Sequence, residues 1–387
     1  MYGATGEGSF LHRDGGTNMH DITSPKMSME ATINSRSVIE DLLDQARIQK
    51  LIECDSNIVS YNPQSFFIIF QQWHRRNLRM IAWPLLGILA WSCAWAAVFT
   101  HLGDWFPRVG DLRAHIVPLD GLINPILTPV SFLLVFRIGR SAVRYWDARA
   151  ATGKIVQICR TFASTAAVGC RRDPRAVERA ARLTCAFPVT VKNFLRAPKR
   201  ECDRRGELGS VLSERDTEDV LRCRDEAGGG LHYGPVLCLN KMRELVHLAC
   251  CGTNHDTIVD GMLYQQLNNH IDILTGSWGA LERINLTPLP FVYVVQLRTF
   301  LVIYLLFWAV LAVAKYSWVS LLPIVFLSWG LLGIEAAAVE CERPFKWKGD
   351  HLSLGKMCIV VAKNVAQTLT DVGHVPELTA GGNTPTR

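Results

Sequence analysis

Three side chains in one apolar stretch could form the constriction of an ion pathway. Thr128, Phe132 and Phe136 recur every four residues, so on a helix they lie along one face. Copies of that helix around an axis would form one ring of hydroxyl groups and two rings of aromatic side chains. The positive edge of a phenylalanine ring tolerates a partly dehydrated anion, and such rings can close a pore by dewetting. The alternative, and the commoner role of this spacing, is packing of the aromatic pair against another helix.

Arg298 is the only formally charged residue between Ile284 and Ala314. An ionisable side chain at membrane depth is costly and usually faces protein, water or lipid headgroups. Two interpretations remain open at this point. Arg298 either extends to the membrane surface along its own aliphatic stem, or lies near a permeation path.

The residue patterns of common catalytic sites are missing from the sequence. It has no nucleophile elbow, no P-loop, no dinucleotide-binding fingerprint and no paired-histidine zinc motif. The 12 cysteines form no C-x-x-C pair, and the 11 histidines show no metal-ligand spacing. We therefore expect no enzymatic activity, no metal, no cofactor and no nucleic-acid partner.

The elements that would position these residues are transmembrane helices. The chain is 49% hydrophobic yet 20% charged, which requires that apolar and charged residues be segregated. Four stretches with little or no charge fit membrane spans of about 20 residues. We predict spans at 80–102, 116–136, 288–314 and 317–339, the last two joined as a tight hairpin. The second contains Pro118, Pro125 and Pro129, so we expect a short, kinked helix covered by protein rather than by lipid all round.

Basic residues flank these spans asymmetrically. They cluster before the first span, after the second and after the fourth, whereas the short connections after the first and third hold few. By the positive-inside rule, both termini and the long middle section are cytoplasmic. We expect a multi-pass membrane protein, most simply of the plasma membrane.

The fold class predicted from these patterns is all-α, with four transmembrane helices and a cytosolic helical domain. Helical periodicity in the middle section predicts helices at 176–195, 235–251 and 257–274, with a charged, Gly-rich mobile loop at 197–231 between the first two. We divide the chain into a disordered tail (1–35), amphipathic and interfacial helices (36–79), a first transmembrane hairpin (80–140), the cytosolic domain (141–283), a second transmembrane hairpin (284–345) and a C-terminal segment with a tail (346–387).

Three ordered blocks in the sequence resemble the bestrophin family of anion channels, in its bacterial, fungal and plant branch. The first block is FRIGRSAVRYWDAR, with matches at Phe136, Arg137, Arg144, Trp146, Ala148 and Arg149 and with Asp147 replacing glutamate. The second comprises Glu282, Arg283, Ile284, Thr287, Pro288, Pro290 and Tyr293. The third comprises Gly333, Ile334, Glu335, Glu340, Glu342, Pro344 and Phe345. The resemblance covers about residues 65–360, although Gly139 stands where the family has asparagine.

The resemblance implies a homopentamer with one axial pore for chloride and other small monovalent anions. The neck residues of the family fall on Thr128, Phe132 and Phe136, where Thr128 replaces the commoner aliphatic residue. A second, cytosolic constriction falls on Met262 by ungapped counting, or on Ile258 after a slip of one turn. The acidic run that binds calcium in the animal branch is replaced by KWKGDHLSL, so we expect no calcium clasp.

We interpret the chain as the subunit of a passive, anion-selective channel in the lipid bilayer, with an axial pore formed by a homopentamer. Two alternatives remain. A secondary anion transporter would be built from inverted repeats or paired broken helices, and the sequence shows neither. A non-conducting scaffold or regulatory protein would use the basic middle section for docking.

Overall fold

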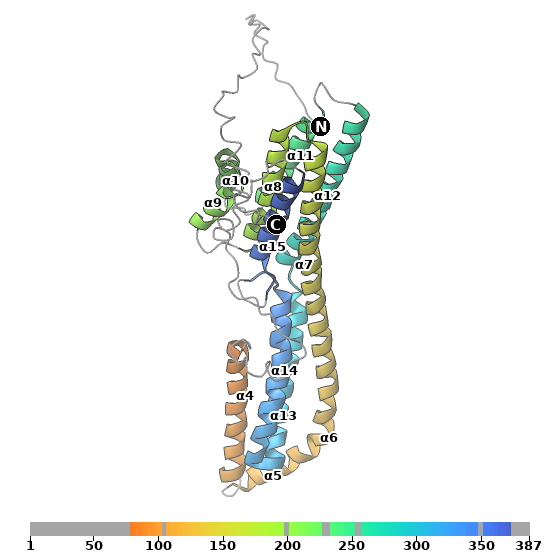
Figure 1. Ribbon diagram of the computed structural model, residues 1–387. Coiled ribbons are helices and arrows are strands. Elements are labelled where there is room, and N and C mark those ends of the chain that lie inside the picture. Colours follow the sequence, from red (N-terminus) through yellow and green to blue (C-terminus); the bar gives the residue numbers. More distant parts are fainter. Residues whose placement is uncertain are drawn as a thin grey trace, which may run out of the picture.

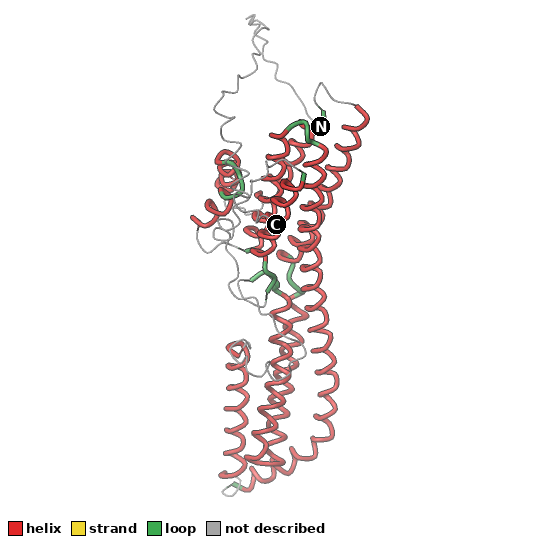
Figure 2. The backbone as a smooth tube through the Cα atoms, in the orientation of Figure 1, coloured by secondary structure: helices red, strands yellow, loops and turns green. Residues whose placement is uncertain are grey.

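The computed structural model describes residues 78–102, 106–196, 201–226, 233–251, 257–346 and 351–372. These ranges contain helices and short connections but no strand, which confirms the predicted all-α class (Figure 2). The predicted tail at 1–35, the predicted helices at 36–79 as far as residue 77, and the part of the predicted C-terminal segment and tail from residue 373 lie outside the described residues.

The helices form two groups stacked along one elongated molecule (Figure 1). One group contains α4, α13 and α14, and the other contains α8, α11, α12 and α15. The long helix α7 runs through both groups and joins them. In the first group, α13 and α14 lie between α4 and α7.

Among the residues that the structure describes, three continuous helical stretches are long and apolar enough to cross a membrane, namely Met80–His101, Arg108–Gly169 and Phe291–Glu342. The first corresponds to α4 (Leu78–Ala97) and the π-helical turn Val98–Leu102, close to the predicted first span. The third stretch holds both the third and the fourth predicted spans, because only a short 3-10 turn separates them.

The second predicted span is broken at its start, as its prolines indicated. It passes through α5 (Pro107–Ile116), α6 (Asp120–Ile123) and two 3-10 turns, Val117–Leu119 and Asn124–Ile126, before α7 begins. Pro118 and Pro125 each occupy an early position of a 3-10 turn, where a missing N–H costs no hydrogen bond.

The helix of this predicted span does not end near Phe136. Helix α7 (Leu127–Gly169) continues without a break for 43 residues, about 65 Å at 1.5 Å per residue. Charged residues begin at Arg137, but they change only the surroundings of the helix and not its backbone. The predicted boundary at residue 140 therefore falls inside one helix.

The hairpin of α13 (Phe291–Tyr316) and α14 (Leu321–Glu342) matches the predicted third and fourth spans. A 3-10 turn at Ser317–Ser320 connects them, and Ser317 has a φ of 53°, which lets the chain reverse. Arg113 from α5 donates its Nε–H to the carbonyl oxygen of Ala314 at 2.7 Å. Lys315 pairs with Asp120 at 2.9 Å. The turn is thus tied to the segment that leads into α7.

The other group contains the predicted helices of the middle section. They are α8 (Pro174–Leu195), α11 (Tyr233–Cys250) and α12 (Thr257–Leu286), joined by α15 (Leu354–Asp371) from the C-terminal part. Asp173 caps α8 by accepting the backbone N–H groups of Arg175 and Ala176. Helix α12 extends past the predicted end at residue 274, so the boundary at 283–284 also falls inside a helix.

The predicted loop at 197–231 is wrong in its secondary structure. It contains α9 (Glu201–Gly209) and α10 (Glu214–Glu226). The hydroxyl oxygen of Ser213 accepts the backbone N–H of Asp216 at 3.2 Å, which caps the start of α10. A buried ion pair between Lys192 and Glu207 attaches α9 to α8. The low overall hydrophobicity of this segment concealed two helices, which are held by these polar contacts and by a few buried apolar side chains such as Leu208 and Val220.

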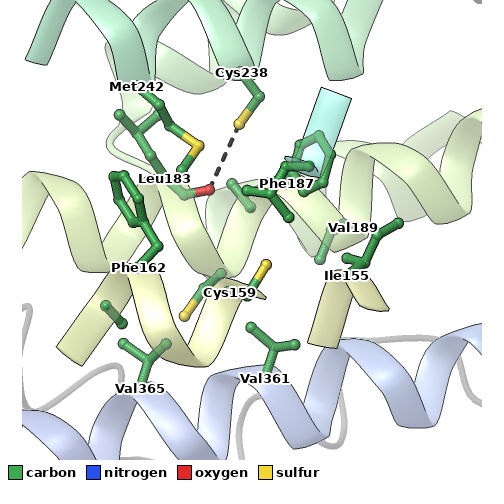
Figure 3. Packing of buried hydrophobic residues seen from close by; sticks show 14 of the residues in the cluster. Ile155, Cys159, Phe162, Leu183, Phe187, Val189, Cys238, Met242, Val361 and Val365 are labelled. Atoms are coloured by element: carbon green, nitrogen blue, oxygen red, sulfur yellow. Dashed lines mark hydrogen bonds between the residues drawn. The ribbon is translucent and has the colours of Figure 1, made fainter. Parts of the chain in front are cut away.

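A continuous apolar core holds the second group together (Figure 3). Phe162 of α7, Phe187 of α8 and Met242 of α11 are completely buried, and Val361 of α15 packs beside them. The thiol of Cys238 donates to the carbonyl oxygen of Leu183 at 3.6 Å. This core holds the C-terminal half of α7, from Ala148 onward, and thereby sets the direction of the N-terminal half.

Candidate functional site

Thr128, Phe132 and Phe136 lie along one exposed face at the start of α7. The side chains of Phe132 and Phe136 are 62% and 51% exposed, and Thr128 is exposed as well. The two rings contact each other edge to face, with centroids 4.5 Å apart and an interplanar angle of 84°. We call these three residues the neck face.

The opposite face of α7 packs against the apolar cluster that includes α13 and α14. Val130 and Leu134 on this side are almost completely buried among side chains from those helices. The neck face consequently points away from the rest of the subunit. Within the described part of the chain, Phe132 and Phe136 pack on each other rather than into the apolar core, so packing within one subunit does not explain them.

Arg137 fastens the neck to α14. Its side chain is 0% exposed, and its Nη2 lies 2.6 Å from a carboxylate oxygen of Glu342. Its Nε lies 3.4 Å from Glu335, and its Nη1 donates to the hydroxyl oxygen of Ser141 at 3.3 Å. A buried arginine with two carboxylates and a hydroxyl group has most of its donors satisfied, which makes its burial tolerable.

Glu335 also binds Arg298 of α13. The Nε of Arg298 donates to the second carboxylate oxygen of Glu335 at 2.8 Å. Arg298 is therefore not a lone arginine that merely extends to the membrane surface. It belongs to a charge network that joins α7, α13 and α14, with Glu335 shared between two guanidinium groups.

Arg144 lies two turns beyond Arg137 on the same side of α7. Its Nε donates to the backbone carbonyl oxygen of Glu342 at 3.0 Å, and its Nη2 donates to the carbonyl oxygen of Ile284 at the end of α12. The remaining residues of this motif, Trp146, Asp147 and Arg149, are exposed. The guanidinium group of Arg149 lies over the Trp146 ring, 5.8 Å from its centroid. The motif thus divides into an anchoring side and an outward side.

The second motif forms the joint between α12 and α13. Helix α12 ends at Leu286, and Pro288 and Pro290 follow it in an extended, exposed connection. Pro290 occupies the N-cap of α13 with a ψ of 126°. Of the other predicted motif residues, Arg283 is exposed, Glu282 is partly buried, and Pro344 after α14 is buried.

Ile258 and Met262 lie in the first turns of α12, at the end of that helix away from α13. Their side chains are 73% and 70% exposed. They are one turn apart on one face, so both candidates for the second constriction are presented on the same side. The structure does not bring them together with the neck face, which is at the start of α7.

Ser141 is a residue of this anchor that the sequence analysis did not name, and Glu342 was named there only as part of the third block, with no role assigned. Their spacing carried a signal. Glu335 and Glu342 are seven residues apart, and Arg137 and Ser141 are four apart, so each pair shares one face of its helix. Two carboxylates on one face of an apolar helix require cationic partners, and the nearest arginines on α7 supply them.

Comparison with known proteins identifies the family. Residues 57–367 match the family described as bacterial/fungal bestrophin protein. A voltage-dependent anion channel-forming protein of Nostoc sp. is 27% identical over 252 residues, which cover 64% of this chain and 76% of the relative. A protein of the same description from Synechocystis sp. is 24% identical over 314 residues, covering 79% of this chain and 92% of the relative.

Solved structures share the fold. A crystal structure of a bacterial bestrophin homologue from Klebsiella pneumoniae has a TM-score of 0.61 and 22% identity, and the match covers 76% of this chain and all (100%) of that one. A variant of that homologue gives a TM-score of 0.63 at 21% identity, covering 74% of this chain and 98% of the other. Because the family match extends over most of the chain, this protein belongs to the bacterial and fungal bestrophin family.

Proposed function

We propose that this chain is the subunit of a passive anion channel that conducts chloride and other small monovalent anions through a homopentamer. The observation that carries the proposal is the neck face, where two aromatic side chains of a membrane-type helix are exposed while the residue beside them is anchored inside the subunit. The relatives described as anion channel-forming proteins support the same activity.

An aromatic neck can select anions without a fixed charge. The edges of the Phe132 and Phe136 rings are the positive parts of their quadrupoles, so edges directed at an axis attract an anion and repel a cation. The apolar rings also favour dewetting, which provides a gate. The hydroxyl group of Thr128 would supply a hydrogen-bond donor at the first ring, and this makes the upper neck wetter than an aliphatic residue would.

The exposed side of α7 beyond the neck adds a second element. Arg140 and Lys154 are exposed there, with Asp147 as the acidic residue between them. A passage lined by surplus positive charge raises the local concentration of anions and lowers that of cations. In our proposal, anions that pass the neck enter such a vestibule and leave through a second constriction at Met262 or Ile258.

The assembly follows from the same exposed face. The side chains of Phe132 and Val135 are large and apolar, yet each is 62% exposed in the isolated subunit. Apolar patches of this kind mark contacts with protein or membrane. Neighbouring copies would cover the short, broken segment before α7. We propose that both termini are cytoplasmic and that the plasma membrane holds the pentamer.

The test is electrical recording from purified protein in planar bilayers, combined with mass photometry of the same sample. A channel gives discrete single-channel steps, and the particles have the mass of five copies. Smooth currents that saturate with substrate would indicate a secondary transporter. Bilayers that remain silent at pentameric mass would indicate a scaffold, and a monomeric mass would remove the shared pore.

A further inference from the structure

A pocket of about 600 Å³ lies where the two groups of helices meet. Its walls come from Arg144 of α7, the end of α8, the end of α12, and the residues that follow α14. This volume is in the range of sites that hold small organic ligands. We call it the junction pocket. The neck face and the second constriction contribute no residue to it.

The junction pocket carries a surplus of positive charge. Its lining includes four cationic side chains, Arg144, Arg196, Arg343 and Lys346, against one carboxylate, Glu342. Glu342 already binds Arg137 through one oxygen at 2.6 Å. Arg144 donates to the backbone carbonyl oxygens of Glu342 and Ile284, and Arg196 donates to those of Phe345 and Leu352, so the backbone holds both guanidinium groups in place. The net charge of the lining therefore favours an acidic ligand.

Arg343 and Lys346 are the cations with donors to spare. Within the part of the chain that the structure describes, neither makes an ion pair or a side-chain hydrogen bond. Arg343 is exposed and Lys346 partly buried at the pocket. The side chain of Asn285 adds an amide donor on the opposite wall. Guanidinium, ammonium and amide groups converging on one cavity suit the oxygens of a phosphate group.

The other lining of the junction pocket is apolar. Leu286, Pro288 and Phe345 belong to it, and Leu286 is 53% exposed. The first turn of α13 follows directly after Pro290. It begins with two apolar side chains, Phe291 and Val292, and both are about 80% exposed. An apolar track thus leads from the pocket along the start of a membrane-type helix.

We propose that the junction pocket binds the headgroup of an anionic phospholipid, with Arg343 and Lys346 at the phosphate and an acyl chain along the start of α13. A free phosphate would use the cations but not the apolar track. The lipid is favoured because the pocket lies next to the first residue of a membrane-type helix, where headgroups are found. Basic pockets between helices on the cytoplasmic side are a known form of headgroup site.

A bound lipid would act on the anchor of the neck. The carboxylate of Glu342 and the guanidinium of Arg144 line the pocket, and both belong to the contacts that hold α7 against α14. An anionic headgroup beside Arg144 completes the charge balance at this joint. Occupancy should therefore raise the thermal stability of the protein.

Native mass spectrometry of the full chain in detergent, with added short-chain phosphatidylglycerol, tests the proposal. We expect bound phosphatidylglycerol and a raised melting temperature, with phosphatidylcholine giving neither. Arg343→Gln with Lys346→Gln should weaken phosphatidylglycerol binding about tenfold or more. Arg283→Gln with Lys356→Gln is the matched control: it removes the same charge from exposed positions outside the pocket and should leave binding unchanged.

Three outcomes would overturn the proposal. Equal binding of phosphatidylcholine would remove the role of charge. Inorganic phosphate that displaces the lipid and gives the same thermal shift would assign the site to a free anion. Equal binding by both double variants would place the lipid elsewhere. A photoreactive phosphatidylglycerol that cross-links to the peptide spanning residues 284–292 in the wild-type protein supports the site without any variant. None of these measurements depends on conduction.

Discussion

Phe136 and Arg137 are neighbours in the chain, but their side chains leave α7 in different directions and meet different surroundings. The phenylalanine side chain is 51% exposed, whereas the arginine side chain is 0% exposed and ion-paired with α14. Successive residues of a helix are rotated by about 100°, so a buried anchor at one position directs the next side chain away from the subunit. The orientation of the neck therefore depends on the charge network behind it.

Replacing Arg137 should be strongly destabilising. Arg137→Gln leaves the partly buried Glu342 without its cation and removes one of the two partners of the buried Glu335. Breaking a buried ion pair from one side costs about 3–5 kcal/mol. Denaturant unfolding in detergent micelles measures the change. Arg140→Gln on the exposed side of the same helix is the control, with an expected change of less than about 0.5 kcal/mol. Equal losses would show that the network does not hold α7.

The stability of the α10–α11 contact should fall at acidic pH. Burial raises the pKa of the Asp216 carboxyl group, but hydrogen bonds and charge from Lys241 outweigh burial and hold that pKa below its ordinary value. The contribution of Asp216 is therefore present above the ordinary carboxyl pKa of about 4 and is lost as pH falls through the lower, folded-state value. Asp216→Asn should cost about 1–3 kcal/mol at neutral pH.

The melting temperature of this variant and of the wild type, followed from pH 8 to pH 3, checks the sign. The difference between the two melting temperatures should stay constant near neutral pH and should disappear as the pH approaches 3. Lys241 does not affect this acidic pH range. Its pKa is raised, so it keeps its charge there and loses it only at alkaline pH. Asp272→Asn, in an exposed pair with Arg243, should leave a gap below about 1 kcal/mol throughout. A gap for Asp216→Asn that widens in acid would refute the assignment.

The buried cysteines should be unreactive in the folded protein. Burial raises the pKa of the Cys185 and Cys238 thiols to about 12, so almost no thiolate forms at pH 8. Cys251, at the end of α11, is exposed. Maleimide labelling followed by peptide mass spectrometry should modify Cys251 within minutes and leave the other two intact until the protein is unfolded. Labelling of Cys238 at the rate of Cys251 would contradict the packing of this core.

Local signals in the sequence predicted much of the fold. Runs with little or no charge located α4, α13 and α14, and the prolines predicted the kinked start of the second span. The end of α7 was missed because the change from apolar to charged residues at Arg137 was taken as the end of a helix. Helices α9 and α10 were missed because charged residues dominate their sequence; only a few apolar side chains, such as Leu208 and Val220, attach them to the core, together with a cap and a buried ion pair.

The neck face could be predicted because it depends only on helical spacing. The pairing of Arg298 with Glu335 could not, since the two residues are 37 positions apart and meet only when α13 folds back on α14. The junction pocket was equally hidden. Its walls come from four parts of the chain, and no local pattern shows that Arg144, Asn285 and Lys346 face one cavity.

Reversal potentials across a planar bilayer with a gradient of potassium chloride test the central claim most directly. The wild-type current should reverse close to the equilibrium potential of chloride. Phe132→Ala with Phe136→Ala should increase the current or change its gating, whereas Phe307→Ala, a similarly exposed phenylalanine on α13, should change neither. A wild-type current that reverses near the equilibrium potential of potassium, or neck variants that behave like Phe307→Ala, would contradict an anion channel with an aromatic neck.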